Sequence, residues 1–412
     1  TQNGVRGGNA TVHFPIWHQE IEDILVLKNN KGTEDNRVRR MDYSIQMSKL
    51  FYERFINEED ITLFSPHAVP GLYDAFGTDK FDALYKKYEK DKSIPKKTIA
   101  AQELFADLLK ERAETGRIYI MNIDHSNSHS SFKDKVSMSN LCQEITLPTT
   151  PIKGIDDPDG EIALCILSAI NVGAIGNLNE LETLCDLSVR ALDEIIELQD
   201  YPVKAAEVST KSRRSLGIGY IGLAHYLAKN GVKYSDPKAW ELVDRLSEAF
   251  QYYLLRASCD IAEEKGKCSA FDRTKYADGL LPIDHYKKEV DEIVVHKQRM
   301  AWETLRKDIL KYGLRHSTLS AQMPSESSSV VSNETNGIEP PRALLSIKKS
   351  KKGPLKQIVP GFPNLKNAYT LLWDMGSNEG YIKIVSVMQK YFDQAISGNW
   401  SYNPLQFENN EV

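Results

Sequence analysis

The sequence predicts an α/β fold in which short, mostly parallel strands alternate with longer helices. Two stretches, 181–195 and 243–254, show the 3.6-residue apolar period of amphipathic helices. Short apolar runs bounded by turn residues favour strands at 24–27, 117–123, 141–147, 162–167 and 317–323. Strands that alternate with helices are typical of parallel sheets. Since no linker-like stretch divides the 412 residues, we expect one large domain over 1–412.

The composition is that of an ordinary globular chain, with 41% hydrophobic residues, 26% charged residues and a formal net charge of -5. This slight acidity gives no bulk attraction to nucleic acid. No apolar run approaches the roughly 18 residues that span a bilayer, so we expect a cytoplasmic protein without a membrane partner. Five scattered cysteines without a CxxC pair indicate neither a disulfide framework nor a structural zinc site.

The two predicted helices bear on three of the cysteines. Cys185 lies on the apolar face of the first helix together with Leu181, which favours a buried structural thiol. Cys259 and Cys268 are expected at and beyond the end of the second helix, with no activating group nearby. The tyrosine pair at 252–253 lies on the second helix and is interpreted as core.

Residues 217–222 match the glycine pattern GxGxxG of dinucleotide-binding folds. That fingerprint requires an apolar strand immediately before it, to lead the chain into the phosphate turn. Here the preceding residues, 209–215, are polar and basic. Close helix packing therefore explains these glycines better than a nicotinamide site.

His125 and His129 have the spacing of a metal-binding pair on a helix. Their surroundings have the composition of a loop, and no third ligand is evident. We therefore expect no metal site.

The stretch from Asn140 to Glu144 is the most informative for chemistry. If it is extended, Asn140, Cys142 and Glu144 share one face, at intervals of about 7 Å. Such a row offers an orienting amide, a sulfur reagent and a general base. A half-exposed strand with a polar face toward water fits the local sequence as well. Cys165, within the apolar run 162–167, is interpreted as core when taken alone.

Met323, Pro324 and Ser325 lead into a run of hydroxyl residues that predicts the start of a helix. Backbone N–H groups at a helix start, together with serine hydroxyls, can hold a phosphate without a lysine. An ordinary capped helix terminus is equally compatible with the pattern. Further on, residues 345–360 predict a hairpin, and its lysines fit a solvated tip better than a phosphate or RNA patch.

Four separated motifs, in the family's order, resemble the large subunit of class I ribonucleotide reductases. They are Asp60-Ile-Thr-Leu-Phe-Ser-Pro-His67, Ser139-Asn-Leu-Cys-Gln-Glu144, Trp302-Glu-Thr-Leu305 with Gly313-Leu-Arg-His-Ser-Thr-Leu-Ser-Ala-Gln-Met-Pro324, and Asn336-Gly-Ile-Glu-Pro340. The match covers nearly the whole chain. The resemblance implies a segment of the family's ten-stranded α/β barrel, with Cys142 on an internal finger loop.

The resemblance also implies roles for the residues of these motifs. Cys142 would carry a thiyl radical that takes hydrogen from the ribose 3′ carbon, and Glu144 would take the 3′-hydroxyl proton. Asn140 would hold the substrate hydroxyls. Cys165 would be one half of the dithiol that delivers two electrons as the 2′-hydroxyl leaves as water. The implied substrate contacts, including those to the diphosphate, are Leu141, Pro324, Ser325, Glu326, Ser327 and Ser328.

By the same resemblance, residues 1–11 form the effector-specificity loop, with Gln2 and Arg6 as its matching residues. Asn3 stands where the family usually has glycine, so the sequence departs from the family pattern at this position. The second redox cysteine, the nucleotide-sensing regions, the tyrosine relay and the swinging cysteine pair are not found in the 412 residues. We therefore expect a catalytic-core segment, incomplete at both ends.

The implied function is reduction of ribonucleoside diphosphates to deoxyribonucleoside diphosphates for DNA synthesis. The implied partners are the missing N- and C-terminal segments, a metal-containing small subunit that generates the radical, thioredoxin or glutaredoxin, and a second copy of the completed subunit. ATP and deoxynucleoside triphosphates would act as effectors, and no cofactor would bind this chain directly. The alternatives are a non-catalytic assembly or nucleotide-binding remnant, and a nicotinamide-dependent oxidoreductase.

Overall fold

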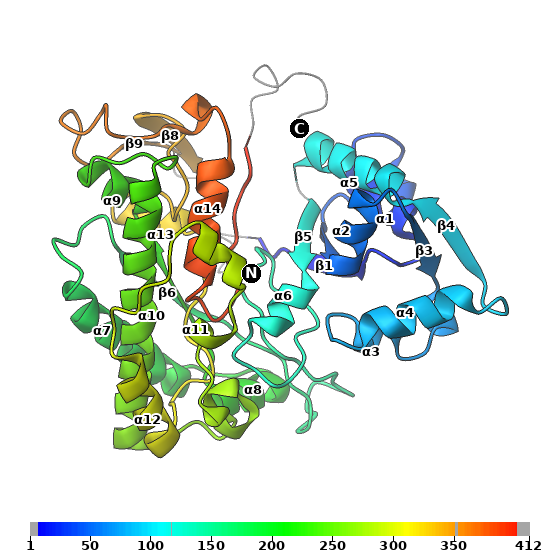
Figure 1. Ribbon diagram of the computed structural model, residues 1–412, viewed down its shortest axis with the longest axis horizontal. Helices are drawn as coiled ribbons and strands as arrows, with labels where there is room; N and C mark the ends of the chain where they lie inside the picture. Colours follow the sequence, from blue (N-terminus) through cyan, green and yellow to red (C-terminus); the bar gives the residue numbers. More distant parts are fainter. Residues whose placement is uncertain (1–6, 117, 351–352, 402–412) are drawn as a thin grey trace. The chain divides into compact units, whose positions relative to one another are not determined.

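The computed structural model describes residues 7–116, 118–350 and 353–401 (Figure 1). The chain divides into two compact units, where the sequence analysis expected one domain. Unit 1 comprises Thr1–Ser130 and Lys135–Pro148, and unit 2 comprises Ser131–Asp134 and Thr149–Val412. Each unit has its own cluster of buried apolar side chains, which is the physical basis of the division.

Unit 1 is built on a parallel sheet of three strands in the order β1-β2-β5. These are β1 (Thr11–Pro15), β2 (Asp42–Met47) and β5 (Ile118–Asn122). An antiparallel pair joins β3 (Asp60–Phe64) to β4 (Lys96–Ala100). The helices of unit 1 are α1 (Ile21–Leu25), α2 (Lys49–Ile56), α3 (Leu72–Ala75), α4 (Phe81–Lys90), α5 (Ala101–Thr115) and α6 (Ile123–Ser128), with short 3-10 turns at Val26–Lys28, Glu34–Asn36 and Pro66–Ala68.

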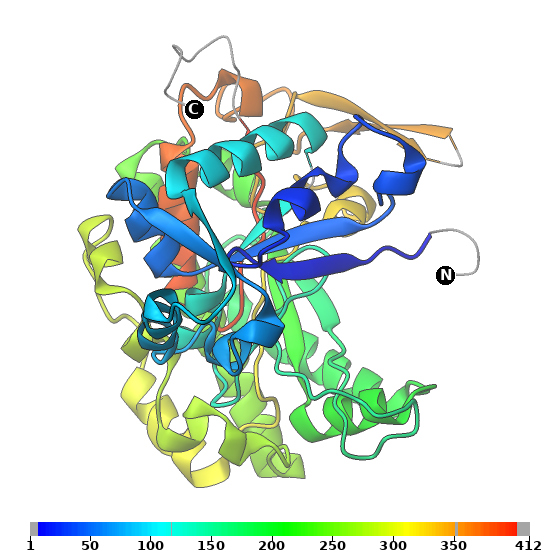
Figure 2. The ribbon, with the colours of Figure 1, turned by 90° about the vertical axis from the view of Figure 1, so that its right-hand side faces the viewer.

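Strand β2 is buried along its whole length because it lies between β1 and β5 (Figure 2). Its side chains alternate, so Ile45 and Met47 point into the apolar core of unit 1. Ser44 and Gln46 point to the opposite face, where they make hydrogen bonds to the segment 137–143. The polar alternation of β2 therefore creates a surface that can hold a loop.

Unit 2 contains a parallel arrangement of two strands and two extended segments. Strand β6 (Ile166–Asn171) pairs with β7 (Leu216–Ile221) in parallel. Parallel bridges then join Ile218 of β7 to Ser320, and Gln322 to Ile396. The predicted parallel strands are thus present, although 317–323 is an extended segment with single bridges rather than a full strand.

Long helices cover this sheet, and α10 (Pro237–Lys265) packs against three of them: α7 (Glu180–Leu198), α12 (Trp302–Tyr312) and α14 (Glu379–Gln389). An antiparallel hairpin of β8 (Leu345–Ser350) and β9 (Gly353–Ile358) lies where the sequence predicts one. Figures 1 and 2 place this hairpin and α12 at opposite ends of unit 2. The remaining helices are α8 (Lys204–Arg213), α9 (Leu223–Lys229), α11 (Pro282–His285) and α13 (Glu326–Val331), with 3-10 turns at Phe271–Arg273, Lys275–Asp278, Lys288–Glu292 and Leu372–Asp374.

The two long helices and the strand at 117–123 are confirmed by α7, α10 and β5. The strand predicted at 24–27 is wrong, because Ile21, Ile24 and Leu25 are buried with the i, i+3, i+4 spacing of a helix. Only the last two residues of the run 162–167 belong to a strand. None of the helices in the described part of the chain has the length and apolarity that a bilayer crossing requires.

The side chains of α7 and α10 correct three details. Cys185 is buried as predicted, but Ile195 is exposed and Ile196 takes its place in the core of unit 2. Cys259 lies within α10 rather than at its end, and it is fully buried. The tyrosine pair at 252–253 is half-buried and packs against the core cluster.

Candidate active site

Residues 137–145 form a loop on the polar face of the unit 1 sheet. The backbone N–H of Gln143 donates to the carbonyl of Asn140 at 3.3 Å, which closes a turn with Leu141 and Cys142 at its corners. Gln143 itself has a left-handed backbone, with φ of 73°. The extended row of Asn140, Cys142 and Glu144 is therefore wrong, because a turn interrupts the two-residue alternation.

Two side chains of the sheet hold the backbone of this loop. Thr11 on β1 donates from Oγ1 to the carbonyl of Leu141 at 3.3 Å. Gln46 on β2 donates from Nε2 to the carbonyl of Ser137 at 2.6 Å. His13 lies on the same face as Thr11, and burial lowers its pKa to about 4, so the imidazole is neutral at neutral pH.

Asn140 stabilises the loop from within. Its Oδ1 accepts the backbone N–H of Ile145 at 3.1 Å. The hydroxyl of Ser139 donates to the carbonyl of Ile145 at 2.7 Å. These two bonds bring together the ends of the segment that contains Cys142, so Asn140 fixes the shape of the loop whatever else its amide binds.

Glu144 combines burial with an unsatisfied oxygen. Its side chain is 3% exposed, and its Oε2 atom has no hydrogen-bond partner among the described residues. Burial raises the pKa of Glu144, although its own backbone N–H and the Asn140 side chain oppose that shift. A carboxylate with a raised pKa and an open lone pair is suited to take a proton from a bound hydroxyl.

The thiols of the chain fall into two groups. Cys142 and Cys165 are partly exposed, whereas Cys185, Cys259 and Cys268 are buried. Burial raises the pKa of Cys259 to about 11 and that of Cys268 to about 12, and it raises that of Cys185 further. Of the five thiols, only those of Cys142 and Cys165 are therefore accessible to a reagent.

Cys165 lies in unit 2, directly before the first residue of β6, Ile166. The prediction that Cys165 alone is a core residue is wrong, because the residue is only half-buried. The cause is that the apolar run 162–165 precedes the strand and does not enter the sheet.

Helix α13 starts where the hydroxyl run predicts a helix. Ser325 is its N-cap residue, but the Ser325 side chain does not cap the helix and donates to the carbonyl of Met323 at 3.3 Å. Ser325 is buried, and Glu326, Ser327 and Ser328 are exposed in the first turn. The N–H of Glu326 donates to the carbonyl of Pro324 at 2.7 Å. The N–H groups of Ser327 and Ser328 are not capped by the Ser325 side chain and can face an anion.

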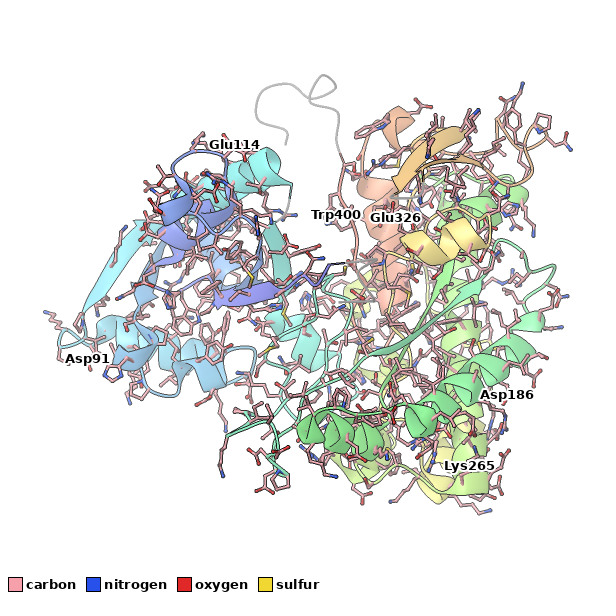
Figure 3. All side chains as sticks on the ribbon, turned by 180° about the vertical axis from the view of Figure 1, so that it is seen from behind. Asp91, Glu114, Asp186, Lys265, Glu326 and Trp400 are labelled. Atoms are coloured by element: carbon pink, nitrogen blue, oxygen red, sulfur yellow. The ribbon has the colours of Figure 1, made fainter. Side chains whose placement is uncertain are left out.

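A pocket of about 250 Å³ adjoins α13 in unit 2. Its wall includes Glu326 of the helix, residues 334–336 and 339–343, and both strands of the hairpin. Glu326 pairs with Lys348 of β8 at 3.6 Å. Figure 3 shows Glu326 beside the hairpin, so the helix start, the loop and the hairpin border one cavity.

The extended segment that leads into α13 is held by Asp393. Its Oδ1 accepts the backbone N–H of Ser320 at 2.8 Å, and its Oδ2 accepts that of Leu319 at 3.0 Å. Tyr276 also donates its hydroxyl to Oδ2, at 2.7 Å. Because all of these groups are buried, Asp393 fixes the course of the chain just before Met323 and Ser325.

The glycines at 217–222 do not form a phosphate loop. Gly219 lies within β7, and a Cβ atom there would stand 2.6 Å from the carbonyl oxygen of Ala321. Gly222 precedes α9 with φ of 82° and lies against Glu334. The expected helix packing is wrong for Gly219, which instead allows the neighbouring extended segment to approach the strand.

The predicted histidine pair and the predicted effector-loop residues are placed as follows. His125 lies on the short helix α6 and His129 follows it, so the loop expected for this pair is wrong. Among the described residues, no group of three or more His, Cys, Asp or Glu could hold a metal ion. Gln2 and Arg6 lie outside the described residues.

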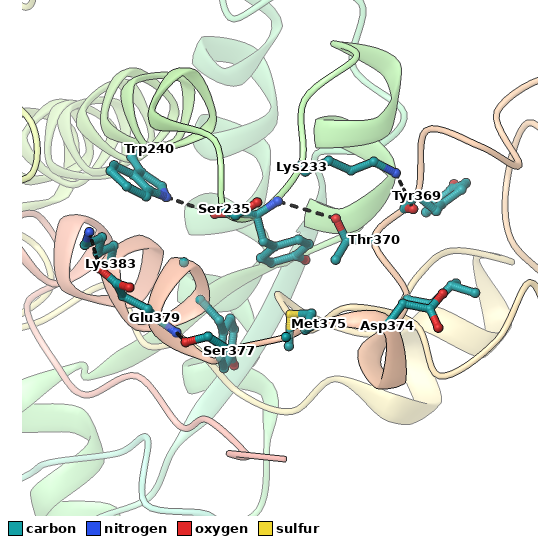
Figure 4. A pocket seen from close by; sticks show the side chains of 15 residues that line it. Lys233, Ser235, Trp240, Tyr369, Thr370, Asp374, Met375, Ser377, Glu379 and Lys383 are labelled. Atoms are coloured by element: carbon teal, nitrogen blue, oxygen red, sulfur yellow. Dashed lines mark hydrogen bonds and ion pairs between the residues drawn. The ribbon is translucent and has the colours of Figure 1, made fainter. Parts of the chain in front are cut away.

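A larger pocket of about 590 Å³ lies elsewhere in unit 2, beside α10 and α14 (Figure 4). Its polar side chains largely bind one another and the backbone. Lys383 pairs with Glu379 at 2.6 Å, Trp240 donates to the carbonyl of Tyr234 at 2.9 Å, and Lys233 donates to two backbone carbonyls. None of the predicted site residues lines this pocket.

Comparison with known proteins defines the class. The family of the ribonucleotide reductase barrel domain matches residues 1–409, and the chain belongs to this family. The predicted family and the α/β class are thereby confirmed.

The chain is also similar in sequence to individual curated proteins. The chain is 58% identical to ribonucleoside-diphosphate reductase subunit alpha of Haemophilus influenzae, over 100% of this chain and 55% of the relative. It is 55% identical to ribonucleoside-diphosphate reductase 1 subunit alpha of Escherichia coli, with the same coverage. The subunit alpha of Enterobacteria phage T4 is 44% identical, again over 100% of this chain and 55% of the relative. The chain thus spans about half the length of the curated relatives that it matches.

The predicted site residues fall into both units. Asn140, Leu141, Cys142 and Glu144 belong to one loop of unit 1, and Cys165 and 324–328 belong to unit 2. The sequence did not predict the side chains that hold the loop of unit 1 and the extended segment before α13. These side chains are Thr11, Ser44, Gln46, Gln143 and Asp393. The polar alternation within β2 was a usable signal for Ser44 and Gln46, whereas nothing local marks Asp393.

Proposed function

We propose that this chain carries the nucleotide-reducing chemistry of a ribonucleoside-diphosphate reductase large subunit. The observation that carries the proposal is the loop of unit 1, in which the partly exposed thiol of Cys142 stands two residues from the buried carboxylate of Glu144, whose Oε2 has no hydrogen-bond partner among the described residues. The membership of the chain in the ribonucleotide reductase family gives this pair its reaction.

In the proposed reaction, a thiyl radical on Cys142 takes the hydrogen atom from C3′ of the ribose, which makes the S–H bond and leaves a substrate radical. Glu144 accepts the proton of the 3′-hydroxyl, for which its raised pKa and open Oε2 suit it. The 2′-hydroxyl leaves as water after protonation. Asn140 holds the substrate hydroxyls through its amide.

Two electrons and the replacement hydrogen come from a pair of thiols, of which Cys165 is one, and the pair ends as a disulfide. Cys142 then returns its hydrogen to C3′ and regains the radical. The exposure of Cys165 supports this role, because a fully buried thiol could not exchange with a substrate. Leu141 contacts the bound nucleoside.

The substrate diphosphate is proposed to bind at the start of α13, where Pro324 leads into the hydroxyls of Ser325, Ser327 and Ser328 and the N–H groups of Ser327 and Ser328. Glu326 borders this site without donating to it, because its N–H donates to the carbonyl of Pro324 at 2.7 Å and its carboxylate pairs with Lys348. A preference for triphosphate substrates would contradict this assignment.

The proposed partners are a small, metal-containing subunit that supplies the radical, thioredoxin or glutaredoxin as electron donor, and a second copy of the large subunit. ATP and deoxynucleoside triphosphates are the proposed effectors. The proposed effector-specificity loop contains Gln2 and Arg6. The cytoplasm is the proposed compartment.

The test is made in a chimaera in which residues 1–412 replace the aligned segment of the Escherichia coli relative. Reduction of CDP to dCDP is measured with dithiothreitol as electron donor and the Escherichia coli radical-generating subunit. We expect turnover that Cys142→Ser abolishes. Cys259→Ala, a buried thiol on α10, serves as the matched control and should keep its activity. A folded, assembled chimaera without turnover would instead indicate a non-catalytic remnant.

A further inference from the structure

The turn that carries Cys142 is closed by the side chain of Gln143. Its Oε1 accepts the hydroxyl of Ser44 at 2.9 Å, and its Nε2 donates to the carbonyl of Asn140 at 3.1 Å. One amide thus joins the central strand β2 to the first residue of the turn. We call this pair of hydrogen bonds the Gln143 bridge.

The backbone at Gln143 requires such support. A residue other than glycine at φ of 73° is in the left-handed region, where a side chain is strained. Strain of this kind persists only where the surroundings enforce it, and it gathers at functional sites. Here the enforcing contacts are the Gln143 bridge and the N–H of Gln143, which also donates to Asn140.

Ser44 requires a hydrogen-bond acceptor in the side chain at position 143. Ser44 is fully buried on β2, in register with His13 on β1, so its hydroxyl needs a partner within the protein. An apolar side chain at 143 would leave that hydroxyl unsatisfied, which costs more than replacing both partners with apolar groups. The two residues are therefore energetically coupled.

We propose that Gln143 is a positioning residue that sets the place of the Cys142 sulfur through the Gln143 bridge. This inference rests on the proposed function, since it assumes that Cys142 reacts. Loss of the bridge frees the turn on the side that faces β2, while Thr11 still holds the carbonyl of Leu141. The thiol then samples several positions, and hydrogen transfer slows because it demands close alignment of the reacting atoms.

The test compares Gln143→Leu, Gln143→Gly, Ser44→Ala and the double variant Ser44→Ala/Gln143→Leu in the chimaera. Gln143→Leu should lower kcat about tenfold with the KM for CDP little changed, and the unpaired Ser44 hydroxyl should lower the melting temperature. Gln143→Gly tolerates the left-handed backbone but lacks the amide, so it should show a similar loss of kcat. Because Ser44→Ala breaks the same bridge, the kcat of the double variant should stay close to that of Gln143→Leu rather than fall by the product of the two single losses.

A second readout does not depend on turnover. The rate at which iodoacetamide alkylates Cys142, followed by peptide mass spectrometry, should rise several-fold in Gln143→Leu and stay raised in the double variant. Gln102→Leu, an exposed glutamine on α5, is the matched control and should change neither quantity.

Unchanged kcat and alkylation in Gln143→Leu would overturn the inference, as would single losses of kcat that multiply in the double variant. An inactive parent chimaera would count against the proposed function alone, because the alkylation rates would still decide whether Gln143 positions the thiol.

Discussion

Replacement of Asp393 by alanine should destabilise unit 2 strongly. The change removes the acceptor of five donors: the backbone N–H groups of Leu319 and Ser320, the hydroxyls of Tyr276 and Ser320, and the side-chain amide of Gln251. All of these donors belong to buried residues. Leaving a buried donor unpaired costs about 1–3 kcal/mol. With about 1.5 kcal/mol for each rigid N–H and about 1 kcal/mol for the Tyr276 hydroxyl, these three donors alone give a predicted loss of about 4 kcal/mol.

The assay is urea unfolding of the chain, followed by circular dichroism, with amide hydrogen exchange at Leu319 and Ser320 as a local measure. Asp200→Ala, an exposed aspartate of the same unit, should change the free energy of unfolding by less than about 0.5 kcal/mol. Tyr276→Phe should cost about 1 kcal/mol in the parent chain and almost nothing when Asp393 is already alanine. A loss below about 1 kcal/mol for Asp393→Ala would refute the reasoning.

Two further predictions concern Glu144 and Gly219. Because burial raises the pKa of Glu144 above its usual 4.5, its ionised form destabilises the fold. Glu144→Gln should therefore raise the melting temperature at neutral pH, and this gain should vanish below pH 4.5; a gain that persists in acid would contradict the assignment. Gly219→Ala would place a methyl group 2.6 Å from the carbonyl oxygen of Ala321 and should cost about 1–3 kcal/mol in urea unfolding. Gly154→Ala, where an added methyl meets nothing within 4 Å, is its control; equal effects would show that the strand contact is not tight.

The comparison of prediction and structure is clearest at the candidate site. The sequence identified Asn140, Cys142 and Glu144 as a group, and the loop of unit 1 contains all three. It predicted the wrong backbone, because the alternation rule assumes an extended chain and the turn at 140–143 depends on hydrogen bonds from distant strands. The helix start at Ser325 was predictable, since the hydroxyl run and Pro324 are local signals.

The sequence by itself determined the family, the α/β class, the two long helices and the residue types that the chemistry needs. Each of these depends on residues close together in the chain, through apolar period or motif spacing. The tertiary structure alone decided how those residues are held. Ser44 meets Gln143 across 99 positions of the chain, and Asp393 meets Ser320 across 73. Such partners are chosen by burial, because a polar group removed from water must be satisfied by whatever the fold brings to it.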